Sequence, residues 1–248
     1  MSPPASTHAE SAPHSGKSVM PQPDLEEAVR EGNLDAIRSL LDGGADVRYV
    51  RPDGYTVMID AMFGANDEQL VPIMKLLIDQ GADLDAVSAY GESALSVASN
   101  IGRFDVVGVL LAAGADSAPL EWTTLLQLVV ALGSVADVQL RIEACDDLSA
   151  RDRWDRTAWL LSLQTGEMDK AEALYAAGAK IADRGRCGRT SLMYAIHHQD
   201  EAMLRWLLAL GADPNAMDDF GGTALIEAAG IGATDCLRIL LEAGADRQ

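Results

Sequence analysis

The chain has 248 residues, a formal net charge of -19 at pH 7 and 48% apolar residues, of which few are aromatic. This acidic surplus disfavours nucleic acid as a partner, because phosphate backbones are bound by an excess of Lys and Arg. No apolar run approaches the ~18 residues of a membrane span, and the N-terminus lacks the apolar centre of a secretory signal. Three cysteines without paired spacing favour reduced thiols. We therefore expect a cytoplasmic protein that does not bind membranes.

Residues 1–22 are rich in Pro, Ser, Ala and His and show neither helical nor alternating periodicity. Such a segment buries too little apolar surface to order itself, so we expect a disordered tail. A short docking motif is the alternative for this segment.

A repeated pattern runs from residue 23 to residue 248. In the typical copy a Thr or Ser precedes an apolar helical run, a small residue follows five places later, and Gly-Ala ends a second run. The spacing is 33 residues from Thr124 to Thr157, Thr190 and Thr223. A hydroxyl that caps a helix start and a left-handed Gly that ends a helix predict a helix–turn–helix unit. A fixed period predicts a stacked array. The predicted units span residues 23–51, 52–88, 89–119, 120–152, 153–185, 186–218 and 219–248.

The second unit has four more residues than its neighbours between Thr56 and Gly81. The surplus falls in the turn-rich stretch GANDEQLVP, which predicts a longer loop between the two helices. Pro72 is then expected in the first turn of the second helix, where the missing N–H has no consequence.

The fourth unit departs from the pattern at both ends. The connector from Gly114 to Thr124 is two residues shorter than the others, which predicts a kink in the stack. Cys145 stands where the other units end in Gly. Because Gly is the residue best suited to a left-handed helix end, we expect irregular geometry at residues 144–147.

These motifs resemble those of the ankyrin repeat family. The family's T-P-L-H-x-A signature corresponds to TALIEA at Thr223–Ala228, TSLMYA at Thr190–Ala195 and SALSVA at Ser93–Ala98. The resemblance covers residues 24–248. It implies an all-α solenoid of about seven stacked helix-turn-helix units with hairpin loops. It also implies a non-catalytic scaffold that binds a partner protein through a concave face of hairpin tips and inner helices. The units with a Thr or Ser opener lack the family's His, so we expect apolar packing to replace it at Ile59, Ser96, Gln127, Leu160, Met193 and Ile226.

The places at which the family usually contacts its partners carry aromatic residues and, in two adjacent hairpins, arginines. Residues 151–189 hold eight basic and six acidic residues, a balance of +2, so the rest of the chain carries -21. Arg and aromatic residues are enriched at binding hot spots. The alternative is that these arginines form solvated ion pairs with Asp152, Asp155 and Asp183. The predicted partner-binding residues are Tyr55, Tyr90, Arg153, Trp154, Arg156, Arg186, Arg189, His197, His198 and Phe220.

Three functions remain open from the sequence. The acidic surface could cover a basic enzyme, as an inhibitor or immunity-like protein that neutralises a toxin; stacks resembling this one occur in microbes in that role. The second alternative is an effector acting on a host protein. The third is a metal or thiol enzyme at Cys187, His197 and His198, although adjacent helical residues point about 100° apart and suit one metal poorly. We expect no cofactor, and a monomer in the absence of the partner.

Overall fold

The computed structural model describes residues 23–122 and 124–246, so the predicted tail at residues 1–22 lies outside the described residues. Within these ranges the chain forms fourteen α-helices, two 3₁₀ turns and three isolated β-bridges, and the all-α prediction is confirmed. None of the described helices is long and apolar enough to cross a membrane.

The helices form seven pairs. The first helices of the pairs stack on one another along each arm, and so do most of the second helices. The first helices are α1 (Pro23–Arg30), α3 (Val57–Gly64), α5 (Ala94–Asn100), α7 (Leu125–Leu132), α9 (Ala158–Thr165), α11 (Ser191–Ile196) and α13 (Ala224–Gly230). The second helices are α2 (Leu34–Asp42), α4 (Asp67–Asp79), α6 (Phe104–Ala112), α8 (Val135–Glu143), α10 (Met168–Ala176), α12 (Glu201–Ala209) and α14 (Thr234–Glu242).

The predicted Thr and Ser openers cap six of the first helices. Each hydroxyl accepts a hydrogen bond from the N–H three residues later, at 3.2–3.5 Å. Each bond satisfies an amide that has no partner inside the helix and contributes about 1 kcal/mol. The small residues of the pattern are fully buried, so neighbouring first helices approach closely; they are Ala61, Ala98, Ser162, Ala195 and Ala228.

Apolar packing replaces the family's His at only some of the expected places. Ile59 and Leu160 are fully buried in the core. At the equivalent places Ser96 and Gln127 instead accept hydrogen bonds from the N–H of the capping residue, at 2.9 and 3.3 Å. The expectation was therefore wrong at these two places, because a polar side chain there completes a reciprocal capping box. Ile226 is 52% exposed, so it does not act as a core residue either.

The surplus of the second unit lengthens a helix and not a loop. Helix α4 has 13 residues where the other second helices have 9, and only Ala65 and Asn66 separate it from α3. Pro72 lies inside α4, so its predicted first-turn position was wrong. Four residues are close to one helical turn of 3.6, which is why the insertion leaves the buried face of α4 unchanged.

Cys145 adopts the backbone conformation of the glycines that it replaces. Its φ is 59°, and its N–H donates to the carbonyl of Ile142 at 3.0 Å. The next N–H, of Asp146, donates to Arg141 at 3.2 Å, as in the regular units. The predicted irregular geometry at residues 144–147 is therefore absent. The unit instead accommodates a non-glycine residue in the left-handed conformation, at a cost of about 1–2 kcal/mol.

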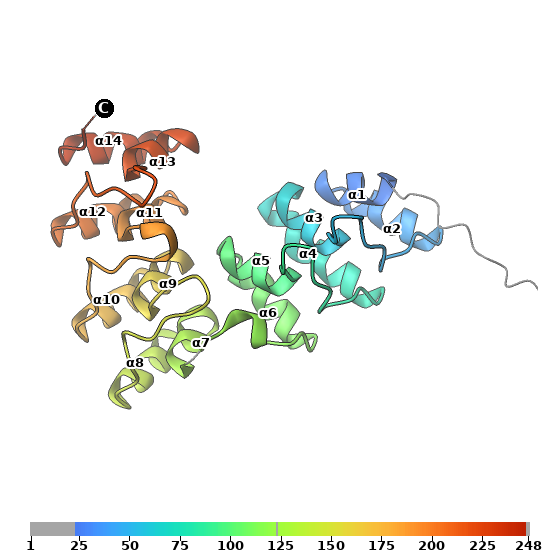
Figure 1. Cartoon of the computed structure of the whole chain (residues 1–248), viewed down its shortest axis with the longest axis horizontal. Coiled ribbons are helices and arrows are strands. Elements are labelled where there is room, and N and C mark those ends of the chain that lie inside the picture. Colours follow the sequence, from blue (N-terminus) through green and yellow to red (C-terminus); the bar gives the residue numbers. More distant parts are fainter. Residues whose placement is uncertain (1–22, 123, 247–248) are drawn as a thin grey trace, which may run out of the picture.

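The stack changes direction at the short connector. The 3₁₀ turn η1 (Ala118–Leu120) takes the place of a hairpin there and packs against α5, while α6 packs against α7. Figure 1 shows the result, two arms formed by α1–α6 and α7–α14 that meet in a V. The kink expected from the connector is present, and it is a sharp turn of the whole chain.

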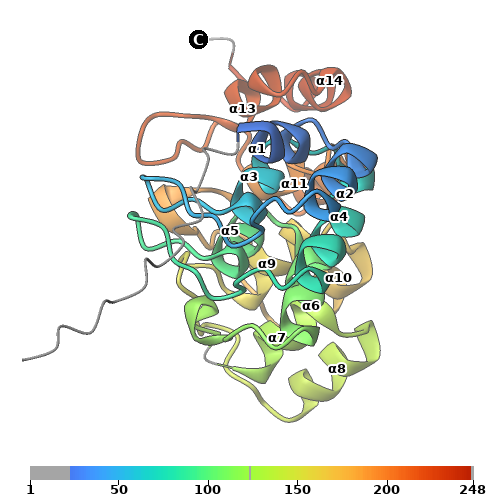
Figure 2. The ribbon, with the colours of Figure 1, turned by 90° about the vertical axis from the view of Figure 1, so that its right-hand side faces the viewer.

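The other hairpins lie side by side and project to the same side of the molecule (Figure 2). Consecutive hairpins are joined by main-chain bonds: the N–H of Arg186 donates to Trp154 and that of Asp219 to Cys187, each at 2.9 Å. Because the fourth unit has no hairpin, the hairpin of unit five lies beside that of unit three, where Arg153 Nη2 donates to the carbonyl of Gly91 at 3.3 Å.

Replacing Cys145 by Gly should stabilise the protein by about 1 kcal/mol, because it removes the strain of a left-handed side chain. For a chain of this size we expect the melting temperature to rise by roughly 2–4 °C in thermal unfolding followed by circular dichroism. The matched control is Gly178→Cys at φ 102°, which should lower it. A fall on Cys145→Gly would contradict the assignment of strain to this residue.

Candidate functional site

A buried arginine joins the two arms at the vertex of the V. Arg156 is 1% exposed and pairs with Asp152, its Nη2 at 2.6 Å from the carboxylate. It also donates to the carbonyl and hydroxyl of Ser99, at 2.8 and 3.0 Å, and to the side-chain oxygen of Gln164. The guanidinium thereby donates hydrogen bonds to acceptors on both arms. We call Arg156, Asp152, Ser99 and Gln164 the clasp.

Further bonds from the second arm reach the end of α5. Gln164 Nε2 donates to the carbonyl of Asn100 at 2.9 Å, and His197 Nε2 lies 3.1 Å from the carbonyl of Ile101. The last carbonyls of a helix have no partner within it and carry partial negative charge. The second arm therefore supplies the donors that α5 itself lacks.

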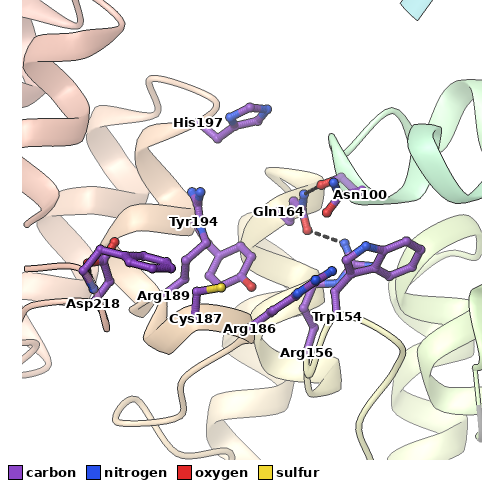
Figure 3. Close-up of a pocket in the computed structure, with 11 residues that line it drawn as sticks. Asn100, Trp154, Arg156, Gln164, Arg186, Cys187, Arg189, Tyr194, His197 and Asp218 are labelled. Carbon is purple, nitrogen blue, oxygen red and sulfur yellow. Dashed lines mark hydrogen bonds between the residues drawn. The ribbon is translucent and has the colours of Figure 1, made fainter. Parts of the chain in front are cut away.

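A cavity of about 390 Å³ lies beside the clasp (Figure 3), within the size range of ligand pockets. It is lined by the consecutive units five, six and seven and by unit three, which the bend brings next to them. Its lining residues are Asn100, Trp154, Arg156, Gln164, Arg186, Cys187, Arg189, Tyr194, His197, Asp218 and Phe220.

Six of the ten predicted partner-binding residues line this cavity, but they differ in what they offer. Arg156 and Trp154 are buried, so their predicted direct contact with a partner needs correction. Arg156 is held in the clasp, and its guanidinium lies 4.6 Å from the Trp154 ring centroid. Arg186 is exposed, and Phe220 is 82% exposed on the next hairpin. His197 is bound to α5, as described above.

The other four predicted residues lie outside the cavity. Tyr55 and Tyr90 form an aromatic cluster with Phe63 on the first arm, with ring centroids 6.0–6.2 Å apart. Burial and the nearby Glu92 raise the pKa of Tyr55, whose hydroxyl donates to that carboxylate. Arg153 joins the hairpins of units three and five, and the ring of His198 contacts the carbonyl of Gln164.

The expected ion pairs account for some of the arginines. Arg156 pairs with Asp152, as the alternative expected, but this pair is buried and not solvated. Asp155 pairs with Arg151, which is not one of the predicted contact residues. Asp183 instead accepts a hydrogen bond from the hydroxyl of Thr157 at 3.3 Å. Arg189 pairs with Glu227 of the next unit at 2.6 Å. Arg153 and Arg186 make no ion pair with the described residues.

The floor of the cavity carries a neutral phenol. Burial raises the pKa of Tyr194, although the positive charges of Arg156 and Arg189 act in the opposite direction. A phenol with a raised pKa stays protonated at neutral pH and keeps its ability to donate a hydrogen bond. Sequence reasoning missed Tyr194, because its place in the repeat lies within the buried first helix and carries no sign of a cavity.

The two histidines suggested for a metal centre do not converge on one point. The rings of His197 and His198 are inclined at 89°, and each contacts a different main-chain carbonyl. Cys187 is exposed in the 3₁₀ turn at residues 186–188 of the unit-six hairpin. Within residues 23–122 and 124–246, no group of three or more His, Cys, Asp or Glu side chains is placed to hold a metal ion.

Comparison with known families agrees with this architecture. A family model of ankyrin repeats in many copies matches residues 159–208 and 192–241, and one of ankyrin repeats in three copies matches residues 25–118. The chain belongs to the ankyrin repeat family. Ankyrin repeat domains are generally protein–protein interaction modules.

The curated relatives are longer proteins. Ankyrin repeat protein nuc-2 of Neurospora crassa is 28% identical over 231 residues, 88% of this chain and 21% of its own length. The B-cell lymphoma 3 protein homolog of Mus musculus is 28% identical, over 79% of this chain and 46% of its own. An L-asparaginase of Dirofilaria immitis is 29% identical over 62% of this chain and 27% of its own. The chain spans less than half the length of each of these relatives.

Among solved structures, the human ASB11 ankyrin repeat domain has 22% identity and a TM-score of 0.46, with 90% of this chain and 99% of that chain covered. The ankyrin repeat domain of Bcl-3 has 25% identity and a TM-score of 0.38, with 90% and 86% covered.

Replacing Arg156 by Met should separate the arms of this ankyrin repeat domain. Asp152 would remain buried without its cation, and loss of one partner of a buried ion pair costs about 3–5 kcal/mol. We expect a lower midpoint in urea unfolding and a larger radius of gyration by small-angle X-ray scattering. The matched control is Arg38→Met on the exposed face of helix α2, away from the contact between the arms, which should cost roughly 0.5 kcal/mol. Equal scattering curves for Arg156→Met and the native protein would refute the clasp.

Proposed function

We propose that this chain is a non-catalytic protein-binding module that holds a partner protein on the concave side, between its two arms. The observation that carries the proposal is the cavity of about 390 Å³ with exposed Arg186 and Phe220 among its lining residues. Contacts between the arms form this cavity before any partner arrives. A preformed site spends less free energy on ordering its own groups when the partner binds.

Exposed aromatic side chains on both arms also favour the concave side as the binding surface. Tyr90 is 72% exposed beside Tyr55 and Phe63 on the first arm, and Phe220 is the most exposed large apolar residue of the second. Single exposed apolar residues are ordinary on protein surfaces, but these stand at or beside hairpin tips, where the family's contacts lie. Aromatic residues and Arg are also the types enriched at hot spots.

The charge distribution favours a second candidate, an inhibitor or immunity-like role against a basic partner. Outside residues 151–189 the chain carries -21. A surface of this sign attracts a basic enzyme and accelerates the encounter, most strongly at low salt. In that case the acidic outer faces would make the contact, and the cavity would not.

Replacing Tyr90 and Phe220 together by Ala should weaken partner binding by about tenfold or more, since truncated hot-spot residues each cost over ~1 kcal/mol. The partner is first captured from native lysate at low and moderate salt, identified by mass spectrometry and purified. Its affinity is then measured by isothermal titration calorimetry against each variant.

The matched control is Leu140→Ala on helix α8, which removes an apolar side chain of similar exposure from an outer helix. It should bind the partner as the native protein does. Unchanged affinity of the Tyr90→Ala, Phe220→Ala variant would show that the partner does not bind to the concave side. A basic partner released by salt would then favour the second candidate.

A further inference from the structure

The cationic tip of one hairpin stands at the cavity. Arg186 begins the 3₁₀ turn η2 (Arg186–Gly188), and its main-chain N–H is fixed on the carbonyl of Trp154 at 2.9 Å. Its side chain is exposed and makes no ion pair or hydrogen bond with the described residues. The backbone is thus held in place while the guanidinium has all its donors available.

The second arginine of this wall is only partly satisfied. Arg189 Nη2 lies 2.6 Å from a carboxylate oxygen of Glu227, and the guanidinium lies 5.3 Å from the Tyr194 ring centroid. Its Nε is buried and has no hydrogen-bond acceptor. Buried donors without an acceptor are rare, and this one adds to the positive potential of the wall.

The acidic side chains around the cavity are committed elsewhere. Asp152 pairs with Arg156, and Glu227 pairs with Arg189. Asp218 accepts the N–H groups of Phe220 and Gly222 at 2.9 and 2.7 Å, which fixes the next hairpin. Asp218 lines the cavity and keeps its negative charge, but its Oδ1 faces these two N–H groups. Arg186 itself makes no ion pair with the described residues, and it lies in a segment whose balance is +2.

We propose that this cavity binds a carboxylate, and that its occupant is an acidic segment of the partner protein. A Glu or Asp side chain of that segment pairs with Arg186, and an adjacent apolar side chain packs on Phe220. The planar guanidinium can form two parallel hydrogen bonds with a carboxylate, which the ammonium group of a Lys cannot do. A basic segment is repelled by Arg186, whereas the charge of Arg189 is compensated by Glu227. This inference rests on the proposed function and names the chemistry of the segment that enters the cavity.

The probe is a short fluorescein-labelled peptide rich in Glu with a central Phe, measured by fluorescence anisotropy on the full chain. Its twin carries Gln in place of each Glu. We expect the Glu peptide to bind and the Gln twin to bind at least about tenfold more weakly, since a charged hydrogen-bonded pair is lost.

Two variants separate the site from the general charge of the molecule. Arg186→Glu should lose the Glu peptide, whereas Lys75→Glu, on the exposed face of helix α4, makes the same change in net charge and should retain it. Both side chains are exposed, so both variants should show the native circular dichroism spectrum. Equal binding of the two peptides, equal loss in the two variants, or no binding of the Glu peptide would overturn the proposal.

The captured partner distinguishes this inference from the function on which it rests. One outcome is that the double variant Tyr90→Ala, Phe220→Ala lowers the affinity for the partner while Arg186→Glu and Lys75→Glu have equal affinities. In that case the concave side binds the partner without recognising a carboxylate. If neither change weakens it, both proposals fail. Loss of the partner in Arg186→Glu, with retention in Lys75→Glu, supports both.

Discussion

The buried guanidinium of Arg156 is the interaction on which the shape of this protein depends. Its contacts with Ser99 span 57 residues of sequence, and they hold the end of helix α5 against the second arm. Removing a charge from water is costly, and the cost is offset here because Asp152, Ser99 and Gln164 together satisfy the guanidinium. This contact holds the arms and the cavity between them in place, together with the bonds of Gln164 and His197 to the end of α5.

A short connector makes that contact possible. In a solenoid each unit ordinarily contacts only its neighbours, so stability accumulates along the stack. Here η1 replaces the hairpin of unit four, and units three and five meet directly through Arg153, Arg156 and Gln164. The loss of a regular element thus creates a contact between units that are not adjacent. The clasp also satisfies carbonyls at the end of α5 that the helix leaves unpaired.

The clasp and the proposed recognition site share a hairpin. Trp154 lies under the guanidinium of Arg156, and its carbonyl accepts the N–H that fixes Arg186. The arginines of these two neighbouring hairpins therefore have different tasks. Arg156 is surrounded by acceptors and holds the structure, whereas Arg186 faces the cavity and makes no ion pair with the described residues. Rigid support of this kind limits the ordering that a partner must impose.

The sequence by itself determined the repeat, the helix starts at the Thr and Ser caps and the left-handed ends, because caps act within a few residues and recur with the period. It also placed arginines and aromatics at the hairpin tips. Only the tertiary structure decided that Arg156 is buried and Arg186 exposed, that the insertion before Pro72 extends a helix, and that His197 contacts Ile101 across 96 residues. The burial of Arg156 and the contact of His197 depend on how far the second arm turns toward the first, which is set by contacts between distant units. The extension of α4 depends on how its own buried face packs, which the turn-forming residues of the insertion did not indicate.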